Sequence, residues 1–244
     1  MIKYGSHNDV CAFILEPILG NGGHIFPPSP EYAKIIRETA DKYGILIIAD
    51  EIQTGFGRTG KMWGSDFIGL KPDIMLVSKI LGGGLPIGAA IFSEDIATKE
   101  MQTATWHAFT FSGNPLLCTA ASAVVDVVVQ EDLPAKAEQT GKFMTARLQK
   151  MQEEHQLIGD VRGPGLFIGA ELVTDRKTKL PATAEVLKIL QESYKRGAIF
   201  GLDKQPGIGN VLKIKPPLNI PWELAEKGLD ILDTCFTDLE RGKI

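Results

Sequence analysis

The sequence predicts an α/β protein with a mostly parallel sheet, followed by a smaller C-terminal α/β lobe. Short apolar runs without polar alternation are separated by helix-length segments, which indicates a parallel sheet buried on both faces. A Gly/Pro-rich break, GDVRGPG at 159–165, marks the boundary of a second unit. At 244 residues the chain can form one large or two small domains. We therefore expect a large domain over 1–158 and a small domain over 159–244.

The expected large domain alternates strands with helices. The segment SPEYAKIIRETADKYG, residues 29–44, predicts a helix because Ser29 can cap its start, Pro30 suits the first turn and Gly44 suits the exit. Four apolar runs predict strands at 12–17, 45–51, 72–79 and 88–93.

Helical segments dominate from the middle of the chain onward. Two helices are expected at 114–130 and at about 134–155. The small domain then reads as a strand, a helix, two strands and a final helix, at 166–173, 183–197, 198–202, 211–216 and about 222–239.

Composition excludes several classes of protein. A net charge of −4 and a pI near 5.6 argue against a nucleic-acid or membrane-surface binder. No run of about 18 apolar residues predicts a membrane span, and the first residues lack the pattern of a signal peptide. Cys11, Cys118 and Cys235 lie far apart without a CxxC motif. This usage predicts a reducing, cytoplasmic location and no metal site.

Charged residues stand at the carboxyl ends of three predicted strands, where parallel sheets collect ligands: Glu16, Asp50 and Lys79. A carboxylate and a lysine amine are the minimal requirement for pyridoxal phosphate, since the lysine forms a Schiff base and the carboxylate keeps the pyridine nitrogen protonated. The alternative is that Asp50 caps a turn and Lys79 is a solvated amine. Because each ends a buried strand, the pair favours the cofactor site. The glycines at 82–84 are interpreted as a tight turn rather than a phosphate loop.

Several ordered motifs carry a family resemblance. EPILGNGG, ADEIQTGFGRTG, PDIMLVSKILGGGLPIGA and HAFTFSGNPL are together similar to the class III, or ω-, aminotransferases of the fold-type I PLP-dependent superfamily. VRGPGLFIGAEL and LKIKPPL resemble the C-terminal lobe of the same family. The resemblance covers about residues 10–239, and it implies transfer of an amino group from an amine or amino acid to a 2-oxo acid.

The resemblance also implies roles for matching residues. Lys79 would form the Schiff base and move the proton between the substrate α-carbon and the cofactor, and Asp50 would pair with the pyridine nitrogen. Gln53 would lie beside the 3′-oxygen of the ring. Thr110 would reach the cofactor phosphate of a neighbouring subunit, which implies a homodimer. His24 and His107 are interpreted as packed loop histidines, and Arg58 and Arg162 as structural residues.

Two positions depart from the family pattern. Asn21 replaces a switch glutamate of the ornithine- and γ-aminobutyrate-type members, and Lys213 replaces an arginine that grips a substrate carboxylate. Lys213 is expected to contact substrate, but lysine is a point charge rather than a fork. This pattern also resembles phospholyases of the family, which eliminate phosphate from phosphorylated amines, so a lyase is an alternative function.

The resemblance also implies that the chain corresponds to the C-terminal portion of the usual family member. The segment that holds the cofactor phosphate and an aromatic residue that stacks on the ring would lie before Met1. A third reading is therefore a non-catalytic fragment or one half of a split enzyme, whose sheet would expose edges and apolar faces.

Overall fold

The structure, a computed structural model, describes residues 9–26, 29, 31–97, 110–203 and 209–244. The chain forms two compact units, and each includes segments that are distant in sequence. The first unit comprises Met1–Ile18, Phe26–Phe56 and Lys61–Asp132, and the second comprises Leu19–Ile25, Gly57–Gly60 and Leu133–Ile244. Two short loops of the first half thus pack with the second half. The predicted boundary between residues 158 and 159 lies inside the second unit, and as a division into domains it stays a prediction.

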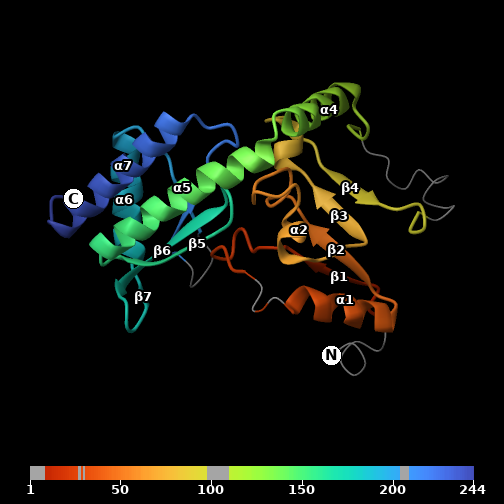
Figure 1. Ribbon diagram of the computed structural model, residues 1–244, viewed down its shortest axis with the longest axis horizontal. Helices are drawn as coiled ribbons and strands as arrows, with labels where there is room; N and C mark the ends of the chain where they lie inside the picture. Colours follow the sequence, from red (N-terminus) through yellow and green to blue (C-terminus); the bar gives the residue numbers. More distant parts are fainter. Residues whose placement is uncertain (1–8, 27–28, 30, 98–109, 204–208) are drawn as a thin grey trace. The chain divides into compact units, whose positions relative to one another are not determined.

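The first unit contains a four-stranded sheet in the order β1-β2-β3-β4 (Figure 1). Strands β1, β2 and β3 are parallel, as expected. Strand β4 is antiparallel to β3, which differs from a purely parallel sheet. The connection between β3 and β4, residues 78–88, contains only the 3₁₀ turn η1 and no crossover α-helix of the kind that joins parallel strands. The strands span Ala12–Leu15, Leu46–Asp50, Ile74–Val77 and Ala89–Phe92.

The helices of the first unit are α1 (Tyr32–Tyr43), α2 (Gly64–Ile68), the 3₁₀ turn η1 (Lys79–Gly82) and α4 (Pro115–Gln130). Gly44 ends α1 in the left-handed conformation, with φ of 64°, which confirms the predicted exit. The predicted cap at Ser29 is wrong. Helix α1 follows Glu31 without a side-chain cap, and the Ser29 carbonyl instead accepts the N–H of Tyr32 in a preceding turn. Pro30 lies outside the described residues.

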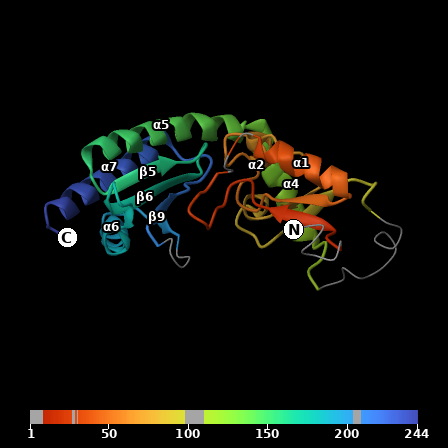
Figure 2. The same cartoon turned by 90° about the horizontal axis from the view of Figure 1, so that it is seen from below.

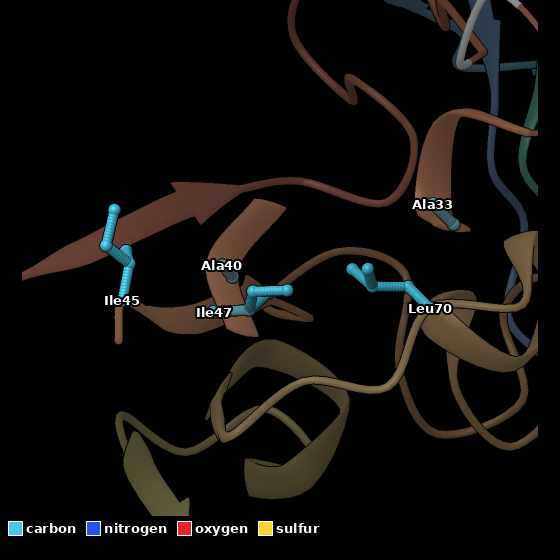
Figure 3. Packing of buried hydrophobic residues seen from close by; sticks show 5 residues of the cluster. All are labelled: Ala33, Ala40, Ile45, Ile47 and Leu70. Atoms are coloured by element: carbon cyan, nitrogen blue, oxygen red, sulfur yellow. The ribbon is translucent and has the colours of Figure 1, made fainter. Parts of the chain in front are cut away.

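The core of the first unit lies on one face of its sheet. Ile47 packs with Ala33 and Ala40 of α1, and Figure 3 shows these side chains with Ile45 and Leu70. Val77 extends the same face and packs with Ala121 of α4 in a second cluster. Along β2 the residues alternate between half-buried and buried, from Leu46 to Asp50. The expectation of a sheet buried on both faces is therefore wrong for the described residues.

The second unit is a small antiparallel sheet covered by long helices. Its strands follow the order β5-β6-β9-β8, with β7 paired to β6. Helix α7 packs against α5 and α6, while α5 packs against β5 and β6 and α6 packs against β6 (Figure 2). The predicted break at 159–165 is in part a strand, β5, because its backbone pairs with β6. The elements span Leu133–Glu154 (α5), Ile158–Arg162 (β5), Ile168–Asp175 (β6), Leu180–Pro181 (β7), Thr183–Lys195 (α6), Gly201–Leu202 (β8), Val211–Ile214 (β9) and Trp222–Glu240 (α7).

A histidine joins two helices of the second unit. His155 follows α5 and is buried, and its two ring nitrogens lie 2.8 Å from carboxylate oxygens of Asp233 and Glu240 on α7. Burial opposes protonation of the ring, but the hydrogen bonds to Glu240 and Asp233 outweigh it and raise the pKa of His155. The folded unit therefore favours an imidazolium between the two carboxylates.

Candidate cofactor site

Three charged residues follow the parallel strands of the first unit. Glu16 follows β1, Asp50 ends β2, and Lys79 comes two residues after β3. Because these strands are parallel neighbours, their carboxyl ends meet at one sheet edge, as expected. Asp50 pairs in register with Leu76, which is three residues before Lys79, so Asp50 and Lys79 lie at the carboxyl ends of neighbouring strands.

The backbone around Lys79 forms a tight, strained turn. Lys79 has φ of 46°, a conformation that costs a non-glycine residue free energy and is concentrated at functional sites. The Ser78 hydroxyl donates to the Ile87 carbonyl at 2.7 Å and fixes the turn. Gly83 and Gly84 also have positive φ, at 57° and 105°, which confirms the predicted turn. The Lys79 side chain is exposed, and its amine makes no hydrogen bond or ion pair with any residue that the structure describes.

Asp50 has one carboxylate oxygen engaged. Its side chain is half-buried, and Oδ1 accepts the N–H of Ile52 at 3.0 Å. Within the described ranges Asp50 forms no ion pair. A fixed carboxylate with a second oxygen available, and an unpaired amine just after the neighbouring strand, fit a cofactor that carries both a protonated ring nitrogen and an aldehyde. Asp50 and Lys79 thus match the donor set that pyridoxal phosphate requires.

The neighbouring Glu51 has a different environment, which the sequence did not reveal. Its side chain is 1% exposed. Oε2 accepts the Gly64 N–H at 2.9 Å and the Thr54 hydroxyl at 2.5 Å. Oε1 accepts the N–H and the hydroxyl of Ser65, at 2.7 and 2.5 Å. Glu51 therefore anchors the first residues of α2 and is fully satisfied by neutral donors. The only sequence signal is that an acid suits a helix N-terminus, but α2 is too short to be recognised.

The structure describes the positions of the other two residues that were predicted to contact the cofactor. Gln53 is half-buried in the turn after β2, three residues beyond Asp50, and Thr110 is exposed in a turn before α4. Their contacts with a ring oxygen and with a neighbouring subunit's phosphate stay predictions. His107 lies outside the described residues.

Lys213 belongs to the second unit, where its ammonium is already paired. Its Nζ lies 3.0 Å from Oδ1 of Asp203 and donates to Oδ1 of Asn21 at 3.3 Å. Asp203 is buried, and its Oδ2 accepts the N–H of Gly23 at 2.9 Å. The two positions at which the sequence departs from the family pattern, 21 and 213, therefore contact each other. Asp203 is a third member of the cluster, which sequence reasoning missed because no motif marks it.

His24 lies beside this cluster as a packed histidine, which confirms its interpretation. The ring is fully buried and contacts Phe167 in a tilted arrangement, with ring centroids 4.6 Å apart. Burial, and then the positive charges of Lys215, Lys213 and Arg162, lower the pKa of His24 to about 3. The ring is therefore neutral, and neither nitrogen has a hydrogen-bond partner among the described residues.

The two arginines of the family motifs have structural roles, as expected. Arg58 donates to the carbonyls of Leu166 and Pro216, and burial lowers its pKa to about 10. Arg162 donates twice to the Gly23 carbonyl and pairs with Glu171 at 2.7 Å. Both arginines thus fix backbone segments within the second unit.

Solved structures share this fold over nearly the whole chain. A Bacillus anthracis aminotransferase is 33% identical, with a TM-score of 0.89, and the match covers 97% of this chain and 54% of that one. An amine transaminase from an uncultivated Pseudomonas species, solved with PLP bound, is 37% identical, with a TM-score of 0.86 and the same coverages. The fold, with Asp50 and Lys79 at adjacent strand ends, is that of the fold-type I PLP-dependent transferases.

Sequence comparison places the chain within that class. The aminotransferase class-III family matches residues 1–236, so the chain belongs to the class III aminotransferase family, whose cofactor is pyridoxal 5′-phosphate. A leucine/methionine racemase from Thermococcus litoralis is 43% identical over 96% of this chain and 52% of its own length. An alanine–glyoxylate aminotransferase 2 homologue from Arabidopsis thaliana is 41% identical over 98% of this chain and 49% of its own length. The chain thus spans about half the length of these relatives.

No helix in the described part of the chain combines the length and the apolarity needed to cross a bilayer.

Proposed function

We propose that this chain carries the lysine and aspartate of a PLP-dependent aminotransferase site. The observation that carries the proposal is the placement of an unpaired amine on Lys79 and a fixed carboxylate on Asp50 at the carboxyl ends of neighbouring strands. When bound, the cofactor supplies a ring that withdraws electrons from the substrate's α-carbon. In this proposal an amine or amino acid donates the amino group and a 2-oxo acid accepts it.

The residues of this chain would act on protons and charge. Asp50 holds a proton on the ring nitrogen, because a fixed carboxylate favours the charged form of its partner. Lys79 binds the cofactor and moves a proton at the α-carbon, for which its exposed amine at the sheet edge is suited. Gln53 would orient the ring through its 3′-oxygen, and Thr110 would contact the phosphate bound by the second subunit of a homodimer.

Lys213 is proposed to contact the substrate and to bind it weakly. Its side chain is 19% exposed, and its charge is shared with Asp203 and Asn21. A substrate anion would compete with the Asp203 carboxylate for one ammonium, which disfavours the tight bidentate binding of an ω-carboxylate. The exposed thiols of Cys11 and Cys118 suit the proposed reducing, cytoplasmic location.

The first test is cofactor labelling. The purified chain is mixed with pyridoxal phosphate, reduced with borohydride and mapped by peptide mass spectrometry. We expect one pyridoxyl group on Lys79, lost in Lys79→Ala and kept in Lys71→Ala, which removes another exposed lysine of the first unit. Scattered labelling of surface lysines, or equal labelling in both variants, would refute the proposed site.

A racemase or epimerase is a second candidate, because a similar relative at 43% identity is a leucine/methionine racemase and another, at 37%, is an isoleucine 2-epimerase. Racemisation uses the same proton transfer but returns the proton to the opposite face, without an acceptor. L-leucine and L-alanine are therefore incubated with and without a 2-oxo acid, and chiral chromatography follows the products. Conversion that depends on the oxo acid supports transamination, and a D-amino acid formed without it supports racemisation.

The phospholyase remains distinguishable by its product. It would release inorganic phosphate from a phosphorylated amino alcohol without any oxo acid. Phosphate release that is absent in Lys79→Ala would favour this alternative over both amino-acid reactions.

A further inference from the structure

The second unit contains a charged cavity of about 360 Å³, and neither Asp50 nor Lys79 lines it. Its lining residues belong to β5, β6 and the turn that leads into β7, and Figure 1 labels these three strands. Ligand sites in proteins begin at about 300 Å³, so a small organic molecule fits. Apart from Gly159 and Val173, all the lining residues are charged. A ligand that enters this cavity must therefore be strongly polar itself.

One end of the cavity carries excess negative charge. Asp160 and Glu171 are paired across β5 and β6, and both carboxylates contact the guanidinium of Arg162, at 2.6 and 2.7 Å. Two carboxylates thus share one positive charge. Each uses only one oxygen in this contact, and the other oxygen has no partner among the described residues. Asp160 is 57% exposed, so its second oxygen can accept a hydrogen bond from a cation in the cavity.

The other end carries positive charge that no carboxylate of the described residues neutralises. Arg176 donates to three backbone carbonyls at the end of α5, those of Gln152, His155 and Gln156. These contacts hold the guanidinium in place, but the acceptors are uncharged. The amine of Lys179 is exposed and makes no hydrogen bond or ion pair within the described ranges. Two cations at this end therefore lack a counter-ion.

Lys179 also has a strained backbone. Its φ of 57° lies in the left-handed region, which glycine adopts without steric cost and lysine does not. The turn around it is fixed by Asp175, whose Oδ1 accepts the N–H of Lys177 and whose carbonyl accepts the N–H of Lys179, both at 2.8 Å. Strained residues are concentrated at functional sites. A lysine at a position that favours glycine thus indicates a use for its amine.

The two charged ends are separated along β6. Glu171 precedes Asp175, the last residue of the strand, by four residues, which is about 13 Å at the level of the backbone. An α-amino acid carries its ammonium and its carboxylate on one carbon, so it cannot contact both ends. A molecule with these groups at the two ends of a short carbon chain can.

We propose that this cavity binds a small zwitterion with a carboxylate at one end and an ammonium at the other. The carboxylate would contact Lys179 and Arg176, and the ammonium would contact Asp160. The site would be separate from the residues that are proposed to bind the cofactor, and it does not depend on the reaction that they catalyse.

The test compares three probes with the same carbon chain. The isotope-labelled full 244-residue chain is titrated without cofactor with δ-aminovalerate, valerate or pentylamine, and the backbone amide shifts are followed by NMR. We expect saturable shifts at residues 159–162 and 176–179, with a Kd for δ-aminovalerate at least tenfold below that for either other probe. No saturable shift, or shifts confined to other residues, would overturn the proposal. Equal binding of valerate would also overturn it and would identify a simple anion site.

Variants of two lysines in one turn locate the carboxylate contact. Lys179→Gly removes the amine and relieves the left-handed backbone, so it should weaken δ-aminovalerate binding at least tenfold without lowering the temperature of unfolding. The control is Lys177→Ala, which removes an equal charge from a residue that does not line the cavity, and it should bind like wild type. Equal loss in both variants would indicate general charge attraction and would overturn the site.

Asp160→Asn tests the ammonium contact. This variant should weaken the binding of δ-aminovalerate and leave that of valerate unchanged, because only the first probe carries an ammonium. An equal effect on both probes would contradict the assigned orientation. None of these measurements requires pyridoxal phosphate or turnover, so their failure is distinct from failure of the labelling test at Lys79.

Discussion

Neutralisation should cost much more folding stability at Glu51 than at the adjacent Asp50. In Glu51→Gln, an amide NH₂ replaces one oxygen. Whichever oxygen the amide nitrogen replaces, the backbone N–H of either Gly64 or Ser65 loses its acceptor. The hydroxyls of Thr54 and Ser65 can instead rotate and accept a hydrogen bond from the new NH₂ group. Each charge-assisted bond contributes about 1.5–3 kcal/mol, and a buried unsatisfied N–H costs about 1–3 kcal/mol. We therefore expect Glu51→Gln to lower the free energy of unfolding by about 3–5 kcal/mol.

The matched control is Asp50→Asn. Its Oδ1 can still accept the Ile52 N–H, and the side chain is half-buried, so the expected loss is about 1 kcal/mol or less. Urea unfolding followed by circular dichroism measures both variants, and hydrogen exchange at Gly64 and Ser65 reports α2 directly. Cofactor labelling at Lys79 should fall in Asp50→Asn. The reasoning would be refuted if Glu51→Gln lost less than about 1 kcal/mol, or if Asp50→Asn lost more than Glu51→Gln.

Two further predictions concern the second unit. A Cβ on Gly141 of α5 would lie 2.0 Å from the backbone oxygen of Gly165, so Gly141→Ala should lower the free energy of unfolding by about 3 kcal/mol or more. The control is Gly228→Ala in α7, where an added Cβ meets nothing within 4 Å, and this variant should be more stable by up to about 1 kcal/mol. Equal effects of the two variants in thermal unfolding would contradict this packing. The pKa of His155 is raised by folding, so its stabilisation is complete below its unfolded pKa of about 6.5 and is lost as the pH rises through the folded pKa. His155→Gln should therefore differ from wild type more at pH 6 than at pH 9 in urea unfolding, and a gap that does not change with pH would refute the imidazolium.

Local sequence patterns predicted most elements of the fold. Strands at β1, β2 and β3, helices α4 to α7 and the exit of α1 at Gly44 follow from apolar periodicity and glycine position, which depend on neighbouring residues only. The start of α1 was misplaced, because capping depends on side-chain geometry that Ser29 does not adopt. Strand β5 was missed because its sequence, IGDVR, has only two apolar residues beside a Gly/Pro-rich stretch, and its backbone is held by pairing with β6.

The sequence by itself determined the family, its cofactor and the position of Asp50 and Lys79 at the ends of neighbouring strands. Only the tertiary structure decided the partners of Glu51, the pairing of Lys213 with Asp203 and the exposure of Ile14. The physical reason is distance along the chain. Asp203 and Gly64 contact their partners through loops and strand pairings that no periodic pattern encodes, whereas motifs and strand ends are local. Whether a face of a sheet is covered depends on what packs against it, which apolar composition alone does not reveal.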